Sequence, residues 1–299
     1  MSIIHYESCP ACFSESISFA LKAKDYTVSQ ETFEIWECAD CTLRFTQNVP
    51  AENAIGKYYQ SAAYISHTDT REGLINSIYH RVRNITLKQK KRLVGADLTA
   101  ETGSLLDIGA GTGAFAKFMQ DSGWQVTGLE PDAETRRRAA EINRIALQPA
   151  NDLFSLPENS FDVVTLWHVL EHVHQLHQYL DQIRKVLKEN GRAFIAVPNY
   201  TGGDANHYKA YWAAYDVPRH LYHFSPASMR RLTISHSLQQ VEIKPMWFDS
   251  FYVSMLSETY KTGSAKNLQA FWQGMTSNFA AMREKERCSS LIYVLTKKS

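Results

Sequence analysis

A glycine-rich turn between an apolar strand and a helix constrains the fold of this 299-residue chain most strongly. Residues 104–108 have the character of a buried strand, residues 109–113 read Gly-Ala-Gly-Thr-Gly, and residues 114–120 predict a helix. Glycines at such a turn let the backbone approach a ligand without interference from a Cβ atom. The G-x-G-x-G spacing differs from the dinucleotide fingerprint, and Asp107 before the first glycine would repel a pyrophosphate but suit a cationic ligand. Glu130 follows the next predicted strand and can accept both hydroxyls of a ribose, so the pattern indicates a nucleoside with a positively charged tail.

Strand-like and helical segments alternate over residues 101 to about 245, which predicts a Rossmann-like, doubly wound and mostly parallel α/β sheet. The expected strands are residues 104–108, 125–129, 161–166 and 192–197. An apolar stripe predicts a helix from Leu176 that stops before Asn190-Gly191, and Ser225-Pro226 predicts the start of another helix.

An aromatic-rich stretch begins near residue 246 and leads into predicted helices that end near residue 287. Residues 290–296 then predict a final strand. This helical insert could cover an apolar acceptor pocket or pack on the sheet.

Four cysteines form two Cys-x-x-Cys pairs near the N-terminus, Cys9 with Cys12 and Cys38 with Cys41. Two such pairs can place four thiolates around one ion, as closed structural zinc sites do. The alternative is four incidental or redox-active thiols, although a redox pair normally occurs singly beside a βαβ unit. Because about 45 residues cannot build an adequate core alone, zinc would supply much of the folding energy of a ribbon over residues 1–47.

The distribution of charge argues against nucleic acid as the main partner. The whole chain has a net charge of +1, and residues 1–50 carry seven acidic and three basic side chains, a net charge of −4 that repels phosphate. A basic run between residues 81 and 92 fits a solvated helix face, or a place where an anionic partner binds. With no secretory signal and no apolar run long enough to span a bilayer, we expect a cytoplasmic protein.

Residues 101 to about 245 resemble the class I S-adenosylmethionine-dependent methyltransferases motif by motif. In that family the glycine loop lies under the methionine part of the cofactor, and the acidic residue after the second strand holds the ribose. The stretch from Asn151 to Asp162 resembles the family segment whose Asp contacts the adenine, and Trp167-His168 resembles the segment near the sulfonium. The resemblance therefore implies that S-adenosylmethionine is bound by Asp107, Gly109, Ala110, Gly111, Gly113, Glu130, Pro131, Asp152, Leu153, Trp167 and His168.

Residues 219–225 resemble the Glu-His … Tyr-Phe-Ser segment of deoxysugar C-methyltransferases, which also carry an N-terminal Cys₄ zinc module. The resemblance implies that His220 is the acid or base and that Tyr59 or Tyr64 supports it, with His223 as a further candidate. The Glu of that family is an Arg in this sequence, which leaves the sugar chemistry open but retains the positioned histidine. Histidine suits proton transfer because its reference pKa is about 6.5.

His168-x-x-Glu171-His172 resembles the Glu-x-x-Glu-His cluster of ubiquinone-pathway O-methyltransferases, which implies a divalent cation near a catechol-like acceptor. The first Glu of that cluster is a histidine here, which disfavours a hard ion such as Mg²⁺. We therefore expect Glu171 and His172 to be structural, with His168 facing the cofactor pocket.

These observations predict an enzyme that transfers a methyl group from S-adenosylmethionine to a small molecule: a sugar nucleotide, a glycan precursor, or a quinone-like or lipid-like metabolite. The alternatives are an RNA base methyltransferase, since some of these join a zinc ribbon to this fold, and a non-catalytic cofactor-binding module that docks a partner protein. The acceptor atom and the oligomeric state stay open. The expected organisation is a zinc ribbon at 1–47, an aromatic segment with a linking helix at 48–100, and a methyltransferase domain at 101–299 with the helical insert at 246–287.

Overall fold

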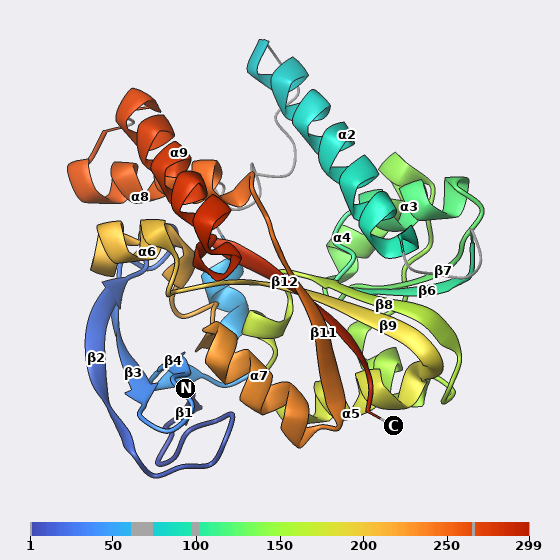
Figure 1. Ribbon diagram of the computed structural model, residues 1–299, viewed down its shortest axis with the longest axis horizontal. Helices are drawn as coiled ribbons and strands as arrows, with labels where there is room; N and C mark the ends of the chain where they lie inside the picture. Colours follow the sequence, from blue (N-terminus) through green and yellow to red (C-terminus); the bar gives the residue numbers. More distant parts are fainter. Residues whose placement is uncertain (1, 61–73, 97–101, 265–266, 299) are drawn as a thin grey trace.

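The computed structural model describes residues 2–60, 74–96, 102–264 and 267–298. Within these ranges the centre of the molecule is a six-stranded sheet of order β11-β12-β9-β8-β6-β7 (Figure 1). The parallel strands are β6 (Ser104–Ile108), β7 (Gln125–Leu129), β8 (Phe161–Trp167) and β9 (Leu187–Pro198), and the antiparallel ones are β12 (Ser290–Lys297) and β11 (Leu238–Pro245). The predicted α/β fold with a mostly parallel sheet is confirmed.

Helices cover both faces of this sheet, because its strands are apolar on both sides. The helices α5 (Leu176–Val186) and α7 (Pro226–Ser235) lie on one face, and α3 (Ala114–Asp121) and the end of α2 (Leu74–Gly95) lie on the other (Figure 1). The predicted start of α7 is confirmed, since Ser225 Oγ accepts the Ser228 N–H at 3.0 Å in a capping box.

The prediction that Asn190-Gly191 forms the left-handed stop of the helix that begins at Leu176 is wrong, because both residues lie inside β9. Helix α5 ends at Val186, and the fully buried Leu187 already pairs with Phe161 of β8. The side chain of Leu187 lies against Gly191, where a Cβ atom would collide with it. Burial of Leu187 therefore starts the strand earlier than the local glycine signal indicates.

The ribbon forms a sheet of order β10-β4-β3-β2. Its own strands are β2 (Ile17–Lys24), β3 (Thr32–Cys38) and β4 (Arg44–Thr46), and the edge strand β10 (Tyr222–His223) comes from the region after the central sheet's β9. A two-stranded pair of β1 (Ile3–Ile4) and β5 (Val49–Pro50) lies beside it. The ribbon is thus continuous, through backbone hydrogen bonds, with the segment that carries the predicted catalytic histidine.

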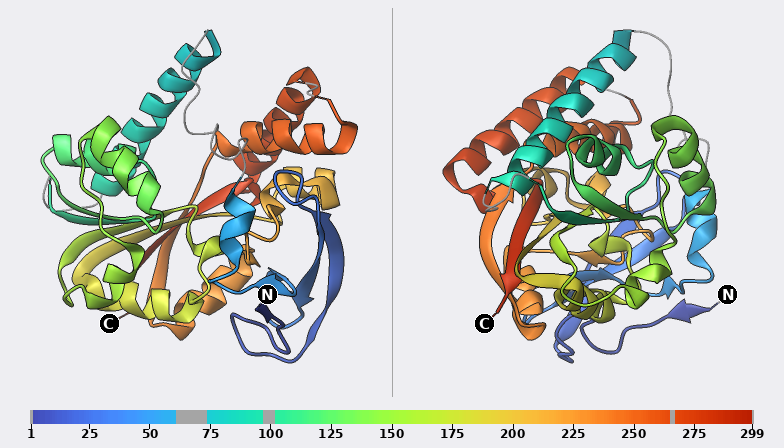
Figure 2. Two further views of the ribbon diagram at one scale, coloured as in Figure 1. Left: turned by 180° about the vertical axis from the view of Figure 1, so that it is seen from behind. Right: turned by 90° about the vertical axis from the view of Figure 1, so that its right-hand side faces the viewer.

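The insert contains α8 (Asp249–Thr262) and α9 (Asn267–Arg283), which pack on α6 (Gly203–Tyr208). Figure 2 shows the insert and the ribbon at one end of the molecule, with α2, α3 and α4 (Ala133–Arg138) at the other. Shorter helical turns are Ile55–Tyr59, Ala139–Asn143, Ala150–Ser155, Leu170–His172, Lys209–Tyr211, Ala213–Tyr215 and Lys285–Arg287. Among the described helices, none is both long and apolar enough to cross a membrane.

Candidate active site

The glycine loop follows β6 and leads into α3, with Gly109, Gly111 and Gly113 at φ of 69°, 56° and 74°. These left-handed values favour glycine at each position. A Cβ atom on Gly109 or Gly113 would collide with Val169 or Ile145, so those two glycines are also required for packing. A Cβ atom on Gly111 would meet no neighbouring atom within 4 Å, and the loop therefore borders open space at its middle glycine.

Glu130 lies at the end of β7 and faces the same loop. Its Oε2 accepts the Gly111 N–H at 2.9 Å and its Oε1 accepts the Asp132 N–H at 3.1 Å. Burial raises the pKa of Glu130 while these amide donors oppose the rise. Each carboxylate oxygen has a second acceptor position, so Glu130 can hold the two hydroxyls of a ribose. Hydrogen bonds hold the main chains of the neighbouring Ala110 and Pro131. The Ala110 N–H donates to the Leu129 carbonyl at 2.8 Å, and the Pro131 carbonyl accepts from Arg136.

The turn that carries Asp152 and Leu153 follows a short backbone pairing of residue 148 with β7. Leu153 is fully buried, while Asp152 is half-buried and its carbonyl accepts the Ser155 hydroxyl. The turn thus lies beside the end of the strand that Glu130 follows. This placement fits the adenine contact that the resemblance implies.

Asp107 and Lys90 interact electrostatically near the end of β6, just before the glycine loop. The buried Asp107 carboxylate accepts the Thr165 hydroxyl at 2.6 Å, and burial raises its pKa to about 6. Lys90 Nζ lies 4.2 Å from the centroid of the Trp167 ring. Burial lowers the pKa of Lys90 to about 8, although the negative charge of Asp107 acts to raise it. Lys90 belongs to the basic run that we expected to be a solvated helix face. It lies one helical turn from the buried Val94, so the two share a face of α2. That spacing could have indicated that Lys90 faces the protein.

His168 connects the cofactor region to the insert. It follows β8 with a φ of 59°, and its ring lies between Asp249 of α8, at 2.9 Å from Nε2, and Glu171, at 3.3 Å from Nδ1. Burial alone would lower the pKa of His168, but the two carboxylates outweigh it and raise the pKa to about 10. The ring is therefore charged at neutral pH. Sequence reasoning missed Asp249, because it lies 81 residues away in the part of the chain with the weakest pattern.

Raising the pH is expected to weaken this junction between β8 and the insert. Because the pKa of His168 is about 10 in the folded chain and 6.5 ordinarily, its stabilisation is complete below pH 6.5 and disappears as the pH rises through 10. Denaturant unfolding between about pH 6 and pH 10 should show this decline in the free energy of unfolding, and Asp249→Asn should flatten it. Glu242→Gln, which alters an exposed ion pair with Lys244, is the control. An undiminished decline in Asp249→Asn would contradict the assignment.

Glu171, His172 and His220 form a cluster, called here the acid–base cluster, in which one ligand atom of each lies within 4.8 Å of the others; Glu171 and His220 are buried and His172 is half-buried. The Nδ1 atoms of His172 and His220 lie 3.1 Å and 2.8 Å from the carbonyls of Arg219 and Ala214. Since a carbonyl can only accept, each Nδ1 carries the proton and each Nε2 is left with a lone pair. Within the described part of the chain, Glu171 Oε2 has no hydrogen-bond partner. Such a donor set can move a proton or hold a metal ion.

The other predicted catalytic residues lie at different distances from the acid–base cluster. The Tyr59 hydroxyl reaches it, 3.2 Å from His172 Nδ1. His223 is part of the ribbon sheet, with its Nε2 3.1 Å from Thr46 Oγ1, and burial lowers its pKa well below the ordinary value. Tyr64 lies outside the described residues. Burial and the neighbouring His220 lower the pKa of His172 to about 4, so His172 is neutral at physiological pH.

The four ribbon cysteines lie together, with their sulfur atoms within 4.8 Å of one another. The Sγ atoms of Cys9 and Cys41 are 3.5 Å apart, and those of Cys12 and Cys38 are 3.6 Å apart. This arrangement has the composition and size of a closed zinc site.

A family model described as a methyltransferase domain matches residues 79–239, just over half of the chain. Ubiquinone biosynthesis O-methyltransferase from Idiomarina loihiensis is 28% identical over 170 residues, covering 52% of this chain and 69% of the relative. Demethylmenaquinone methyltransferase from Tropheryma whipplei is 30% identical over 95 residues, covering 30% of this chain and 40% of the relative. A solved S-adenosylmethionine-dependent methyltransferase from Archaeoglobus fulgidus aligns with 16% identity and a TM-score of 0.49, covering 72% of this chain and 94% of its own. The chain spans roughly half the length of most of the other curated relatives that it matches.

Proposed function

Because the chain belongs to the S-adenosylmethionine-dependent methyltransferases, we propose that it transfers the methyl group of that cofactor to a small molecule bound beside His220. The observation that carries the proposal is the open space at Gly111, bordered by the Glu130 carboxylate and lying on the same sheet edge as the acid–base cluster. When bound, the cofactor supplies a methyl group on a positively charged sulfur. The residues proposed to hold it are Asp107, Gly109, Ala110, Gly111, Gly113, Glu130, Pro131, Asp152, Leu153, Trp167 and His168.

His220 is the proposed general base. As the acceptor takes the methyl group it gives up a proton to His220 Nε2, and the resulting imidazolium is stabilised by Asp216, whose Oδ2 lies 4.0 Å from that nitrogen. The hydrogen bond from Nδ1 to the Ala214 carbonyl keeps the lone pair on Nε2. Tyr59, and Tyr64 beyond the described residues, are the proposed supporting groups. His223 is less suited to act as the base, because its Nε2 already bonds Thr46 Oγ1 in the ribbon sheet.

The acceptor is proposed to be a small molecule because the ribbon beside the site has a net charge of −4 over residues 1–50, which repels RNA. Two of the relatives, a ubiquinone biosynthesis O-methyltransferase and a demethylmenaquinone methyltransferase, favour a quinone-like acceptor over a sugar nucleotide, a glycan precursor or a lipid-like metabolite. The deoxysugar C-methyltransferases have a Glu at the position of Arg219, which here bonds Asp25 of the ribbon. This replacement also favours a quinone-like acceptor over a sugar.

The ribbon cysteines are proposed to hold one structural zinc ion. A second candidate role for metal is a cation held by the acid–base cluster, favoured by the unpartnered Glu171 Oε2 and by the close approach of one ligand atom from each of the three residues. Metal analysis of Glu171→Gln separates the two, because this change would remove a second ion and leave the ribbon zinc in place.

Glu130→Ala is expected to weaken S-adenosylmethionine binding by about 10²-fold to 10³-fold, because it removes charge-assisted hydrogen bonds to two hydroxyls. Calorimetric titration measures this directly. Glu134→Ala, four residues away on an exposed turn of α4, serves as the control and should bind normally. Equal affinities in both variants would mean that the nucleoside does not lie at Glu130.

The proposed function itself is tested by incubating the protein with S-adenosylmethionine that carries an isotopically labelled methyl group. A small-molecule extract and an RNA extract are offered in parallel, and products are found by mass spectrometry. Label in a low-mass compound is the expected result. Label confined to RNA, or none with either extract, would overturn the proposal.

A further inference from the structure

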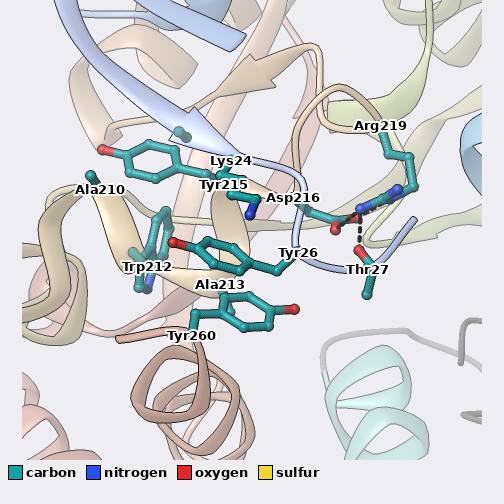
Figure 3. A pocket seen from close by; sticks show the side chains of 11 residues that line it. Lys24, Tyr26, Thr27, Ala210, Trp212, Ala213, Tyr215, Asp216, Arg219 and Tyr260 are labelled. Carbon is teal, nitrogen blue, oxygen red and sulfur yellow. Dashed lines mark hydrogen bonds and ion pairs between the residues drawn. The ribbon is translucent and has the colours of Figure 1, made fainter. Parts of the chain in front are cut away.

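Arg219 joins the loop that carries His220 to the ribbon through a fully buried guanidinium group (Figure 3). Its Nη2 lies 2.9 Å from Asp25 Oδ1 and 2.6 Å from Asp216 Oδ1, and also donates to Thr27 Oγ1 at 2.5 Å. Its Nη1 donates to the Tyr58 carbonyl at 2.7 Å. A buried charge must be paired, so this arginine is satisfied only while the ribbon, the segment after it and the loop are held together.

Asp25 is preorganised for this contact by its own turn. Its carboxylate accepts backbone N–H groups of Thr27, Val28 and Ser29 at 3.0, 3.1 and 2.8 Å. Burial alone would raise the pKa of Asp25, but Arg219 and these donors lower it well below its usual range. The ribbon therefore presents a fixed negative charge to Arg219.

Arg219 also contacts the acid–base cluster on its other side. Its carbonyl accepts His172 Nδ1 at 3.1 Å, and the next residue in the chain is His220. Asp216, which shares the guanidinium with Asp25, accepts the His220 N–H on its carbonyl and approaches His220 Nε2 with its carboxylate. The same arginine thus holds both histidine-bearing segments.

A second attachment fixes the same stretch of loop from β4. Thr46 Oγ1 donates to the His220 carbonyl at 2.7 Å, and its N–H donates to the Leu221 carbonyl at 2.9 Å. The main chain of His220 is therefore held by the ribbon from two directions.

We propose that Asp25 is a positioning residue for His220, acting through Arg219, so that the ribbon completes the active site of the methyltransferase domain. The inference rests on the proposed role of His220. Without the Asp25 charge, Arg219 keeps a buried positive charge with one carboxylate partner, and the loop rearranges to hydrate it. His220 moves with the loop, and a displacement of about 1 Å can slow a positioned reaction by about 10²-fold.

The test compares full-length Asp25→Asn with the control Glu34→Gln, which makes the same carboxyl-to-amide change in a partly exposed ion pair with Lys22. Turnover is measured with the labelled cofactor and the small-molecule extract. We expect Asp25→Asn to lower kcat by about 10-fold to 100-fold. The KM for S-adenosylmethionine should change less than about twofold, because the Asp25 contact lies on the acceptor side of the site. Asp25→Glu, which restores the charge, should recover part of the loss.

Hydrogen exchange gives a second measurement that needs no acceptor. The Leu221 N–H bonds the Glu171 carbonyl at 2.8 Å, and we expect its exchange to be at least about tenfold faster in Asp25→Asn, with the amides of β6 and β8 unchanged. If Asp25→Asn does not fold, Thr27→Val should show the same changes at smaller size, because it removes one neutral acceptor of Arg219 and the hydroxyl that donates to Asp25 but leaves the Asp25 charge in place.

Normal kcat and normal loop exchange in Asp25→Asn would overturn the inference, as would equal losses of kcat and cofactor affinity. The variant His220→Ala distinguishes failure of this inference from failure of the proposed function. If His220→Ala retains full turnover, the base assignment is wrong; if His220→Ala is inactive while Asp25→Asn is normal, only the positioning role is wrong.

Discussion

His220→Ala is expected to slow methyl transfer by about 10²-fold to 10⁴-fold, the usual contribution of a positioned general base. The dissociation constant of S-adenosylmethionine should stay within about twofold of its value in the unmodified protein, because His220 is proposed to lie on the acceptor side of the site. Steady-state turnover and calorimetric binding, measured on the same preparation, check both parts.

His220→Asn separates the proton-transfer role from a structural one. The Asn side chain can still donate to the Ala214 carbonyl, as His220 Nδ1 does, but it offers no base at the position of Nε2. A loss as large as that of His220→Ala supports the base assignment, whereas near-normal turnover would show that the residue only holds the loop. His207→Ala, an exposed histidine on α6, is the control.

Cys38→Ser is expected to release zinc, unfold the ribbon and abolish methyl transfer. Apparent zinc-binding energies of small cysteine sites are on the order of 10 kcal/mol, which exceeds what this small sheet could replace. Loss of β4 also removes the partner strand of β10 and the Thr46 bond to the His220 carbonyl. Elemental analysis, circular dichroism and turnover measure the three effects.

Cys288→Ser is the matched control, because Cys288 is buried, lies outside the four-cysteine cluster and contacts the Met246 carbonyl. It should retain one zinc ion per chain. Retained zinc in Cys38→Ser, or full turnover in a zinc-free ribbon, would contradict the proposed site and its link to the active site.

The residues proposed to bind the cofactor could be grouped from the sequence because they are local. The strand, glycine loop and helix around Gly109, Gly111 and Gly113 are contiguous, and Glu130 follows the neighbouring strand, so their spacing reports their geometry. The predicted α/β sheet follows from the same kind of local pattern. The exception is the start of β9, where burial of Leu187 outweighed the turn signal at Gly191.

The acceptor half could not be predicted in the same way, because its contacts join distant segments. Asp25 and Arg219 are 194 residues apart, and His168 reaches Asp249 across 81 residues. No local pattern encodes such pairs. In the sequence, Arg219 is noticeable only because the deoxysugar C-methyltransferases have a Glu at this position. Its ion pairs with Asp25 and Asp216 explain why an arginine is needed in this chain.

A crystal structure with bound S-adenosylhomocysteine would test the proposed role of His220, because it locates the sulfur from which the methyl group has left. We predict that this sulfur, with the nucleoside at Glu130 and the loop at Gly111, faces a small cavity bordered by His220. A sulfur separated from His220 by other side chains, or one that faces a wide basic trough, would contradict the proposed role of His220 and the proposed small-molecule acceptor.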